Sequence, residues 1–231
     1  MKKDIFLVDA DNTLLDFHAS SFLSLRAVFE SFGVAWEERF AKTFTKLNDF
    51  LWEQLERKEI KREELIKIRF PIYLKDLGFS QIDAEVFNQR FLQFLSEKPV
   101  YIQDAEDFLK ALNKLGKVYI VTNGTERIQK SRFDIVGLWQ YANGVFISDT
   151  IGVDKPDRRY TDYVISHING FERARAVWIG DSLSADIKAA NEAKIDSIWF
   201  NPEKKSLKND EIVPTWDVDN FSEILSILER N

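Results

Sequence analysis

Residues 5–13 have the sequence Ile-Phe-Leu-Val-Asp-Ala-Asp-Asn-Thr, a short apolar run followed by two aspartates that are separated by one alanine. Such a run is typical of a strand that is buried on both faces of a parallel sheet. Ligands of open parallel sheets bind at the carboxyl ends of the strands. The stretch therefore predicts a buried first strand that carries Asp9 and Asp11 into one site. A bound cation would offset their repulsion, and Mg²⁺ prefers such oxygen ligands.

Later parts of the chain repeat this pattern. Short apolar runs that are rich in β-branched or aromatic residues predict further strands at 118–121, 145–147, 177–179 and 197–200. Helical stretches are predicted at 104–115, 126–136, 157–167, 184–192 and 221–228, with Pro156 in a first helical turn. Strands that alternate with helices predict an α/β fold with a parallel sheet.

Between about residues 18 and 98 the spacing changes. Apolar residues now recur every three or four positions, as in Phe40, Phe44, Leu47 and Leu51, and no strand-like run interrupts them. This is the period of amphipathic helices. We therefore predict a helical insertion at 18–98 and a core domain formed by residues 1–17 and 99–231.

Polar residues also follow the other predicted strands. They are Thr122-Asn123-Gly124 after the second strand, Lys155 before Pro156, and Asp181 and Asp186 after the fourth strand. A hydroxyl, an amide and a glycine at a strand end can bind an anion, and a lysine can direct its ammonium at a phosphate. Taken singly, each group has an ordinary explanation as a helix cap or a solvated side chain. Together they favour a phosphate site.

The four motifs, in this order, resemble those of the haloacid-dehalogenase superfamily. The matching residues are Asp9, Asp11, Thr13, Thr122, Asn123, Lys155, Asp181 and Asp186. The resemblance implies a Rossmann-like core with strand order 5-4-1-2-3 and an α-helical cap inserted after the first motif. The spacing pattern places a helical insertion at the same point of the chain.

The chain is also similar to the pyrimidine 5′-nucleotidase subgroup of that superfamily. The similarity lies in Leu51-Trp52, Arg69-Phe70 and Pro214-Thr215-Trp216, whereas Asn12 and Thr125-Glu126 depart from it. The subgroup dephosphorylates nucleoside monophosphates, so a pyrimidine nucleotide is the implied substrate. Trp52 and Phe70 are candidates to stack on its base, although aromatic residues at helical spacing more often belong to a core.

The resemblance also implies the role of each residue. Asp9 is the nucleophile, and Asp11 is the general acid and base. Asp9, the main-chain carbonyl of Asp11, and Asp181 bind Mg²⁺. Asp186 and Thr13 lie next to these metal ligands and support them without being ligands themselves. Thr122, the Asn123 amide and Lys155 bind the phosphate.

Composition narrows the classes of partner and location. The chain of 231 residues has no cysteine, which excludes disulfides, thiolate catalysis and cysteine-bound zinc. A net charge of −6 disfavours a nucleic-acid polymer as partner, and Lys204, Lys205 and Lys208 are expected in a solvated loop. No apolar stretch approaches a membrane span. We therefore expect a cytoplasmic protein that acts on a small phosphate monoester.

Other functions fit less well. Gly180-Asp181-Ser182-Leu183 matches the block of the GDSL esterases, but no histidine follows His167 to complete their triad. A receiver domain has no long helical insertion. A 2-haloacid dehalogenase lacks the second aspartate that Asp11 supplies. That enzyme, and a phosphatase for another small phosphorylated metabolite, remain the alternatives.

Overall fold

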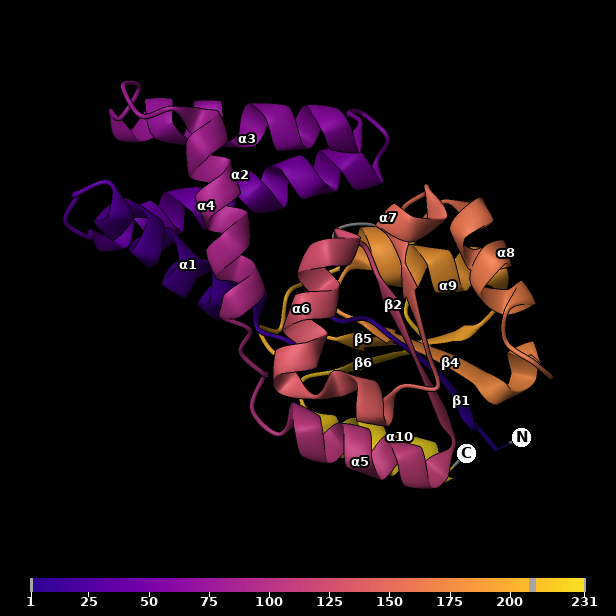
Figure 1. Cartoon of the computed structure of the whole chain (residues 1–231). Coiled ribbons are helices and arrows are strands. Elements are labelled where there is room, and N and C mark those ends of the chain that lie inside the picture. Colours follow the sequence, from indigo (N-terminus) through magenta and orange to yellow (C-terminus); the bar gives the residue numbers. More distant parts are fainter. Residues whose placement is uncertain (1, 208–210, 231) are drawn as a thin grey trace. The chain divides into compact units, whose positions relative to one another are not determined.

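A computed structural model describes residues 2–207 and 211–230 of the chain. Lys208 of the predicted solvated loop lies outside these residues. The chain forms two compact units. The first, here called the sheet unit, contains the residues up to Asp16 and those from Tyr101 onward, and the second, the helical unit, is Phe17–Val100 (Figure 1).

The described residues of the sheet unit contain one parallel sheet of six strands in the order β3-β2-β1-β4-β5-β6. The strands are β1 (Ile5–Val8), β2 (Lys117–Thr122), β3 (Gly144–Ile147), β4 (Ala176–Gly180), β5 (Asp196–Phe200) and β6 (Trp216–Val218). The predicted order 5-4-1-2-3 is confirmed for the first five strands. The prediction omitted the edge strand β6, because three residues that include the exposed Asp217 form no apolar run.

Helices cover both faces of this sheet. They are α5 (Ala105–Leu115), α6 (Glu126–Val136), α7 (Ser148–Ile151), α8 (Arg158–Ser166), α9 (Lys188–Ala193) and α10 (Phe221–Arg230), with short 3₁₀ turns η1 (Leu138–Tyr141) and η2 (Arg173–Arg175) and the π-helical turn η3 (Leu183–Ile187). Side chains of α5, α6 and α10 pack on one face, and those of α8 and α9 pack on the other. The sheet is thus the middle of three layers, and its strands are apolar on both sides.

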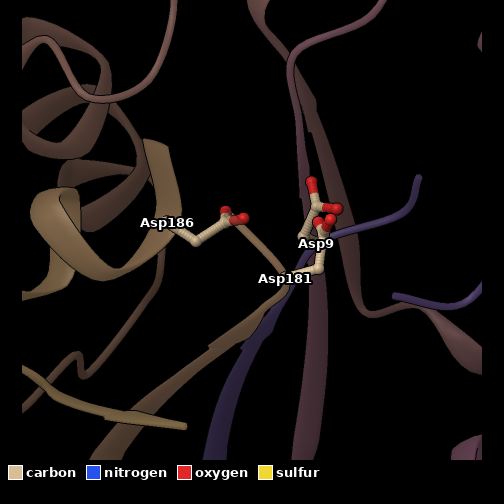
Figure 2. Close-up of side chains that lie close together, drawn as sticks. All are labelled: Asp9, Asp181 and Asp186. Atoms are coloured by element: carbon tan, nitrogen blue, oxygen red, sulfur yellow. The ribbon is translucent and has the colours of Figure 1, made fainter. Parts of the chain in front are cut away.

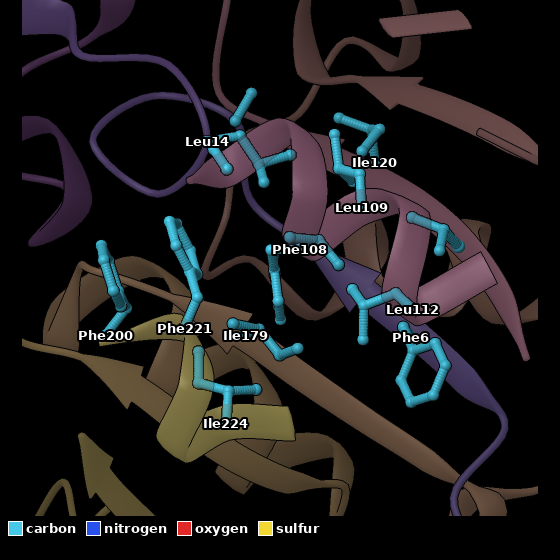
Figure 3. Packing of buried hydrophobic residues seen from close by; sticks show 14 of the residues in the cluster. Phe6, Leu14, Phe108, Leu109, Leu112, Ile120, Ile179, Phe200, Phe221 and Ile224 are labelled. Atoms are coloured by element: carbon cyan, nitrogen blue, oxygen red, sulfur yellow. The ribbon is translucent and has the colours of Figure 1, made fainter. Parts of the chain in front are cut away.

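The first strand illustrates how this arrangement follows from the pleat. Phe6 and Val8 belong to the core under α5 and α10, whereas Ile5 and Leu7 point to the opposite face. Figure 3 shows Phe108 of α5 and Phe221 of α10 in this core, and their rings stack with centroids 4.6 Å apart.

Three local predictions need correction. The helix predicted at 157–167 begins at Arg158, because the Asp157 side chain caps it by accepting a hydrogen bond from the Arg159 N–H, so Pro156 precedes the helix. The helix predicted at 184–192 is divided into η3 and α9. The short helix α7 was not predicted, since four residues are too few to show a period.

The chain leaves and re-enters the sheet unit at one place. Leu15 and Tyr101 form an antiparallel bridge, and the Ile102 N–H donates to the Leu14 carbonyl over 2.9 Å. The residues on either side of the helical unit are therefore held side by side within the sheet unit.

All residues of the helical unit are described, and they form α1 (Phe17–Ser31), α2 (Glu38–Glu56), α3 (Arg62–Leu77) and α4 (Ala84–Glu97). Aromatic rings that recur at helical spacing fill its interior, among them Phe29, Phe40, Phe44, Phe70, Tyr73, Phe87 and Phe91. Phe70 is completely buried between these rings, so it is a core residue, as aromatic residues at helical spacing more often are, and it is not a candidate to stack on a base. Trp52 is half-buried, with the Arg62 guanidinium 5.4 Å from its ring centroid. Within residues 2–207 and 211–230, no helix combines the length and apolar character that crossing a bilayer requires.

The contribution of α10 to the core can be measured. Ile224→Ala removes a fully buried side chain from this helix and should lower the free energy of unfolding by about 2–5 kcal/mol. The exposed residue Glu229 of the same helix provides the control, because Glu229→Ala should change it little. Urea titrations followed by tryptophan fluorescence give both values, and equal stabilities of the two variants would contradict the packing described.

Candidate active site

Three carboxylates meet at the carboxyl edge of the sheet. Asp9 follows β1, Asp181 follows β4, and Asp186 lies in η3. One oxygen of each lies within 4.8 Å of one oxygen of the others, and Figure 2 shows the three side chains directed toward one another. The Asp9 N–H donates to the Ile179 carbonyl over 2.9 Å, which continues the pairing of β1 with β4 up to the site. The predicted first and fourth motifs are therefore adjacent.

Lys155 is the cation between these acids. Its Nζ lies 2.5 Å from Asp9 Oδ1 and 2.7 Å from Asp186 Oδ1, and it donates a third hydrogen bond to the Val121 carbonyl over 2.8 Å. An ammonium has three protons, so all of them are used. Burial alone would lower the pKa of Lys155, but the charges of Asp186 and Asp9 reverse this effect and raise it above its usual value. Lys155 is therefore a permanent charge.

One lysine does not balance three acids. Burial raises the pKa of Asp9 to about 7, and the charges of Asp186 and Asp11 also raise it, although Lys155 opposes them. The single lysine thus leaves a surplus of negative charge among the three acids. Oxygen donors with a surplus of negative charge suit a hard divalent cation. Asp9 and Asp181, with Asp186 beside them, fit such an ion.

Three hydrogen bonds hold the Asp186 carboxylate in place. Its Oδ1 accepts hydrogen bonds from Lys155 and, over 3.1 Å, from Trp178 Nε1, while Oδ2 accepts one from the Ser182 N–H over 3.3 Å. Gly180 makes room for it, because a Cβ at that position would lie 2.3 Å from Asp186 Cγ. These contacts involve both carboxylate oxygens of Asp186.

Asp11 has a different environment from Asp9. Its side chain is 27% exposed, and two residues of α6 hold it. Arg132 Nη1 lies 2.6 Å from Asp11 Oδ1, and Gln129 Nε2 donates to Oδ2 over 2.8 Å. Asn12, with φ of 60°, turns the chain just after it. The two aspartates of the first motif are thus held by separate cations.

Gln129 and Arg132 were not among the residues predicted from the sequence. They occupy core-facing positions of α6, beside Ile128 and Phe133. The available signal was two polar residues three apart on the buried face of a helix that begins just after the second motif.

The second motif contacts both of its neighbours. Thr122 is buried, and its Oγ1 accepts a hydrogen bond from Gln129 Nε2 over 2.9 Å. The Asn123 side chain binds the main chain of Lys155: Nδ2 donates to the Lys155 carbonyl over 2.9 Å, and Oδ1 accepts from the Lys155 N–H over 2.8 Å. The Asn123 side chain therefore holds the lysine segment. The main-chain N–H of Asn123 is then the candidate donor to a phosphate.

Thr13 completes the predicted set. It is fully buried, and its hydroxyl makes no hydrogen bond to any described residue. The sheet unit thus contains all eight predicted residues. Lys155 contacts Asp9 and Asp186, and an oxygen of Asp181 lies within 4.8 Å of an oxygen of each of these acids. Asn123 joins them through Lys155, and Asp11 joins Thr122 through Gln129.

Comparisons with known proteins agree on one family. A family model described as haloacid dehalogenase-like hydrolase matches residues 3–194. The protein named HAD-hydrolase YfnB of Bacillus subtilis is 34% identical over 222 residues, which are 96% of this chain and 94% of that protein. A crystal structure of YfnB bound to magnesium matches with a TM-score of 0.93 and 33% identity over 99% of both chains.

Two further relatives have a named activity. The pyrimidine 5′-nucleotidase PynA of Streptococcus pneumoniae is 34% identical over 226 residues, or 97% of this chain and 94% of that protein. The pyrimidine 5′-nucleotidase YjjG of Escherichia coli is 27% identical over 228 residues, or 99% of each.

The charge balance at Lys155 can be tested without an activity assay. Lys155→Met leaves two buried carboxylates without their shared cation and should lower the free energy of unfolding of metal-free protein by about 3–5 kcal/mol. Added Mg²⁺ should then stabilise the variant more than the wild type, because the acids have lost their other positive charge. Thermal melts with chelator and with Mg²⁺ provide both comparisons.

The control is Lys130→Met, which removes a lysine that is 54% exposed and should have little effect. Equal stabilities of Lys155→Met and this control would show that the Lys155 ammonium does not stabilise the buried carboxylates.

Proposed function

Because the chain belongs to the haloacid dehalogenase-like hydrolases, we propose that it is a phosphatase in which Asp9 accepts the phosphoryl group before water removes it. The observation that carries the proposal is the pair formed by Asp9 and Asp11. Asp9 is buried and faces the other acids, whereas Asp11, two residues later, is partly exposed. An ester oxygen needs a proton when it leaves, and Asp11 supplies a second carboxyl group for that purpose.

Mg²⁺ is the proposed metal ion. Asp9, Asp181 and the main-chain carbonyl of Asp11 would hold it, with Asp186 behind them. The surplus of acid around Lys155 supports this assignment. When bound, the ion would neutralise charge on the phosphoryl oxygens and on Asp9.

The protein groups then carry out two displacements. An Asp9 oxygen attacks phosphorus and forms an aspartyl-phosphate, the bond from phosphorus to the ester oxygen breaks, and Asp11 gives its proton to that oxygen. In the second displacement, Asp11 accepts a proton from water as the water oxygen attacks phosphorus. The bond between phosphorus and Asp9 breaks, and inorganic phosphate leaves with both aspartates restored.

The remaining residues bind the transferred group. The Thr122 hydroxyl, the Asn123 main-chain N–H and the Lys155 ammonium would donate to the phosphoryl oxygens, where negative charge is stabilised. The hydrogen bonds between Asn123 and Lys155 support this role, because they fix the lysine segment against the second motif.

The proposed substrate is a pyrimidine nucleoside 5′-monophosphate. The groups above would treat every phosphate monoester alike, so we assign the choice of substrate to the helical insertion at 18–98, acting as a cap. Its half-buried Trp52 could offer a base an apolar face. Two relatives with this activity support the substrate, and movement between domains is reported for YfnB. A cytoplasmic location, with no nucleic-acid or membrane partner, completes the proposal.

Removal of the nucleophile tests the mechanism. Asp9→Asn keeps the size of the side chain but should reduce phosphate release from a good substrate to below about one per cent of wild type. Asp107→Asn, which changes an aspartate that is 79% exposed, should keep full activity. Retention of more than a few per cent by Asp9→Asn, after purification free of host phosphatases, would refute the proposed nucleophile.

A panel of phosphate monoesters tests the substrate. The ratio of kcat/KM for dUMP to that for glucose 6-phosphate should exceed about tenfold, since one stacking contact is worth about 1–3 kcal/mol. Chelation should stop turnover, and Mg²⁺ should restore it. A ratio near one would leave a general phosphatase, whereas indifference to chelator would point toward dehalogenase-like chemistry.

A further inference from the structure

We propose that Gln129 and Arg132 of α6 are positioning residues that hold the Asp11 carboxyl group for proton transfer and orient the Thr122 hydroxyl as a donor to the phosphoryl group. The proposal rests on the function proposed above, because it assigns Asp11 and Thr122 the roles given there. It adds two residues outside the four motifs.

The contacts fix both oxygens of one carboxylate. Oδ1 of Asp11 forms an ion pair with Arg132 Nη1 at 2.6 Å, without a hydrogen bond, and Oδ2 accepts a hydrogen bond from Gln129 Nε2 over 2.8 Å. A carboxylate held through one oxygen can still rotate, but one held through both cannot without losing a contact. The partly exposed Asp11 side chain thus receives its orientation from the buried face of α6.

Arg132 also determines which way the Gln129 amide faces. Arg132 Nη1 donates to Gln129 Oε1 over 2.8 Å, and both side chains are 1% exposed. An arginine can only donate, so the amide oxygen must face it and the NH₂ group must face away. The two amide protons then point to Asp11 Oδ2 and to Thr122 Oγ1, the latter over 2.9 Å.

This arrangement gives the Thr122 hydroxyl a direction. Its oxygen already accepts a hydrogen bond from Gln129, so its own proton is available to donate elsewhere. A donor is what a phosphoryl oxygen requires. One amide group therefore sets the orientation of the proposed acid and base and of a proposed phosphate ligand.

Two further observations favour a functional role over a merely structural one. Nε and Nη2 of Arg132 are buried and make no hydrogen bond to any described residue, so the guanidinium is placed there at a cost that an apolar side chain would avoid. Gly124 keeps the space open, because a Cβ there would lie 2.5 Å from Gln129 Cγ. The glycine of the second motif thus leaves space for the Gln129 side chain.

The test compares substrates with different leaving groups. Gln129→Met and Arg132→Met keep unbranched side chains but remove the contacts to Asp11. For dUMP, kcat should fall on the order of 10–100-fold, as for other residues that orient reactive groups, with little change in KM. The single-turnover rate of leaving-group release should fall much less for p-nitrophenyl phosphate, because nitrophenolate scarcely needs a proton.

A double-mutant cycle with Asp11→Asn supplies the decisive comparison. Gln129 also contacts Thr122, and the loss through that contact should be the same for both leaving groups. The part of the Gln129→Met loss that is specific to dUMP acts through Asp11, so this part should disappear when the substitution is made in Asp11→Asn. Gly124→Ala should reproduce the Gln129→Met pattern by displacing that side chain. The exposed residue Arg127 of the same helix provides the control, and Arg127→Met should keep activity within about twofold of wild type.

A dUMP-specific loss that remains when Gln129→Met is added to Asp11→Asn, equal losses for both leaving groups in Gln129→Met alone, or full activity of Gln129→Met would overturn the proposal. Should Arg132→Met fail to fold, as judged by circular dichroism, Gln129→Met and Gly124→Ala carry the test. Failure of the proposed function looks different, since the wild type would then release no phosphate or Asp9→Asn would remain active.

Discussion

The ammonium of Lys155 is the contact on which the site depends. It joins the end of β1 through Asp9, the end of β2 through the Val121 carbonyl, and the turn after β4 through Asp186. These segments are far apart in sequence, and two of them bring acids that repel each other. One buried ammonium that bonds to all three segments allows them to meet at one point. The Asn123 side chain secures the lysine from its main-chain side.

Around that contact, two neighbouring aspartates acquire different properties. Asp9 is enclosed, faces Asp181 and Asp186, and has its pKa raised mainly by burial. Asp11 reaches solvent and is held by a guanidinium and an amide. Carboxyl groups that share a site but not an environment can take separate chemical roles. This difference in environment supports the separate roles that we propose for the two aspartates.

The features of this architecture that are determined by short stretches of sequence were predictable. Apolar runs such as Ile5–Val8 and the polar residues that follow them specify strands and their reactive ends, because both signals lie within a few residues. Contacts across the fold were not predictable in this way. Gln129 and Arg132 are recognisable only once α6 lies beside the first motif. From the sequence alone, the Asn123 side chain could have faced a ligand and Phe70 could have lain on the surface. Only the tertiary contacts of these two residues decide between the alternatives.

The bridge between Leu15 and Tyr101 has a consequence for how such proteins diversify. The sheet unit itself holds together the two points where the helical insertion leaves and returns, so the entropy of closing that long loop is already met by sheet contacts. An insertion attached in this way can change without moving its two points of attachment. Its length and sequence can drift while the ends of the strands, and the acids on them, keep their geometry. Under the proposed division of roles, exchange of this one module would change the substrate while the sheet unit kept the same reaction.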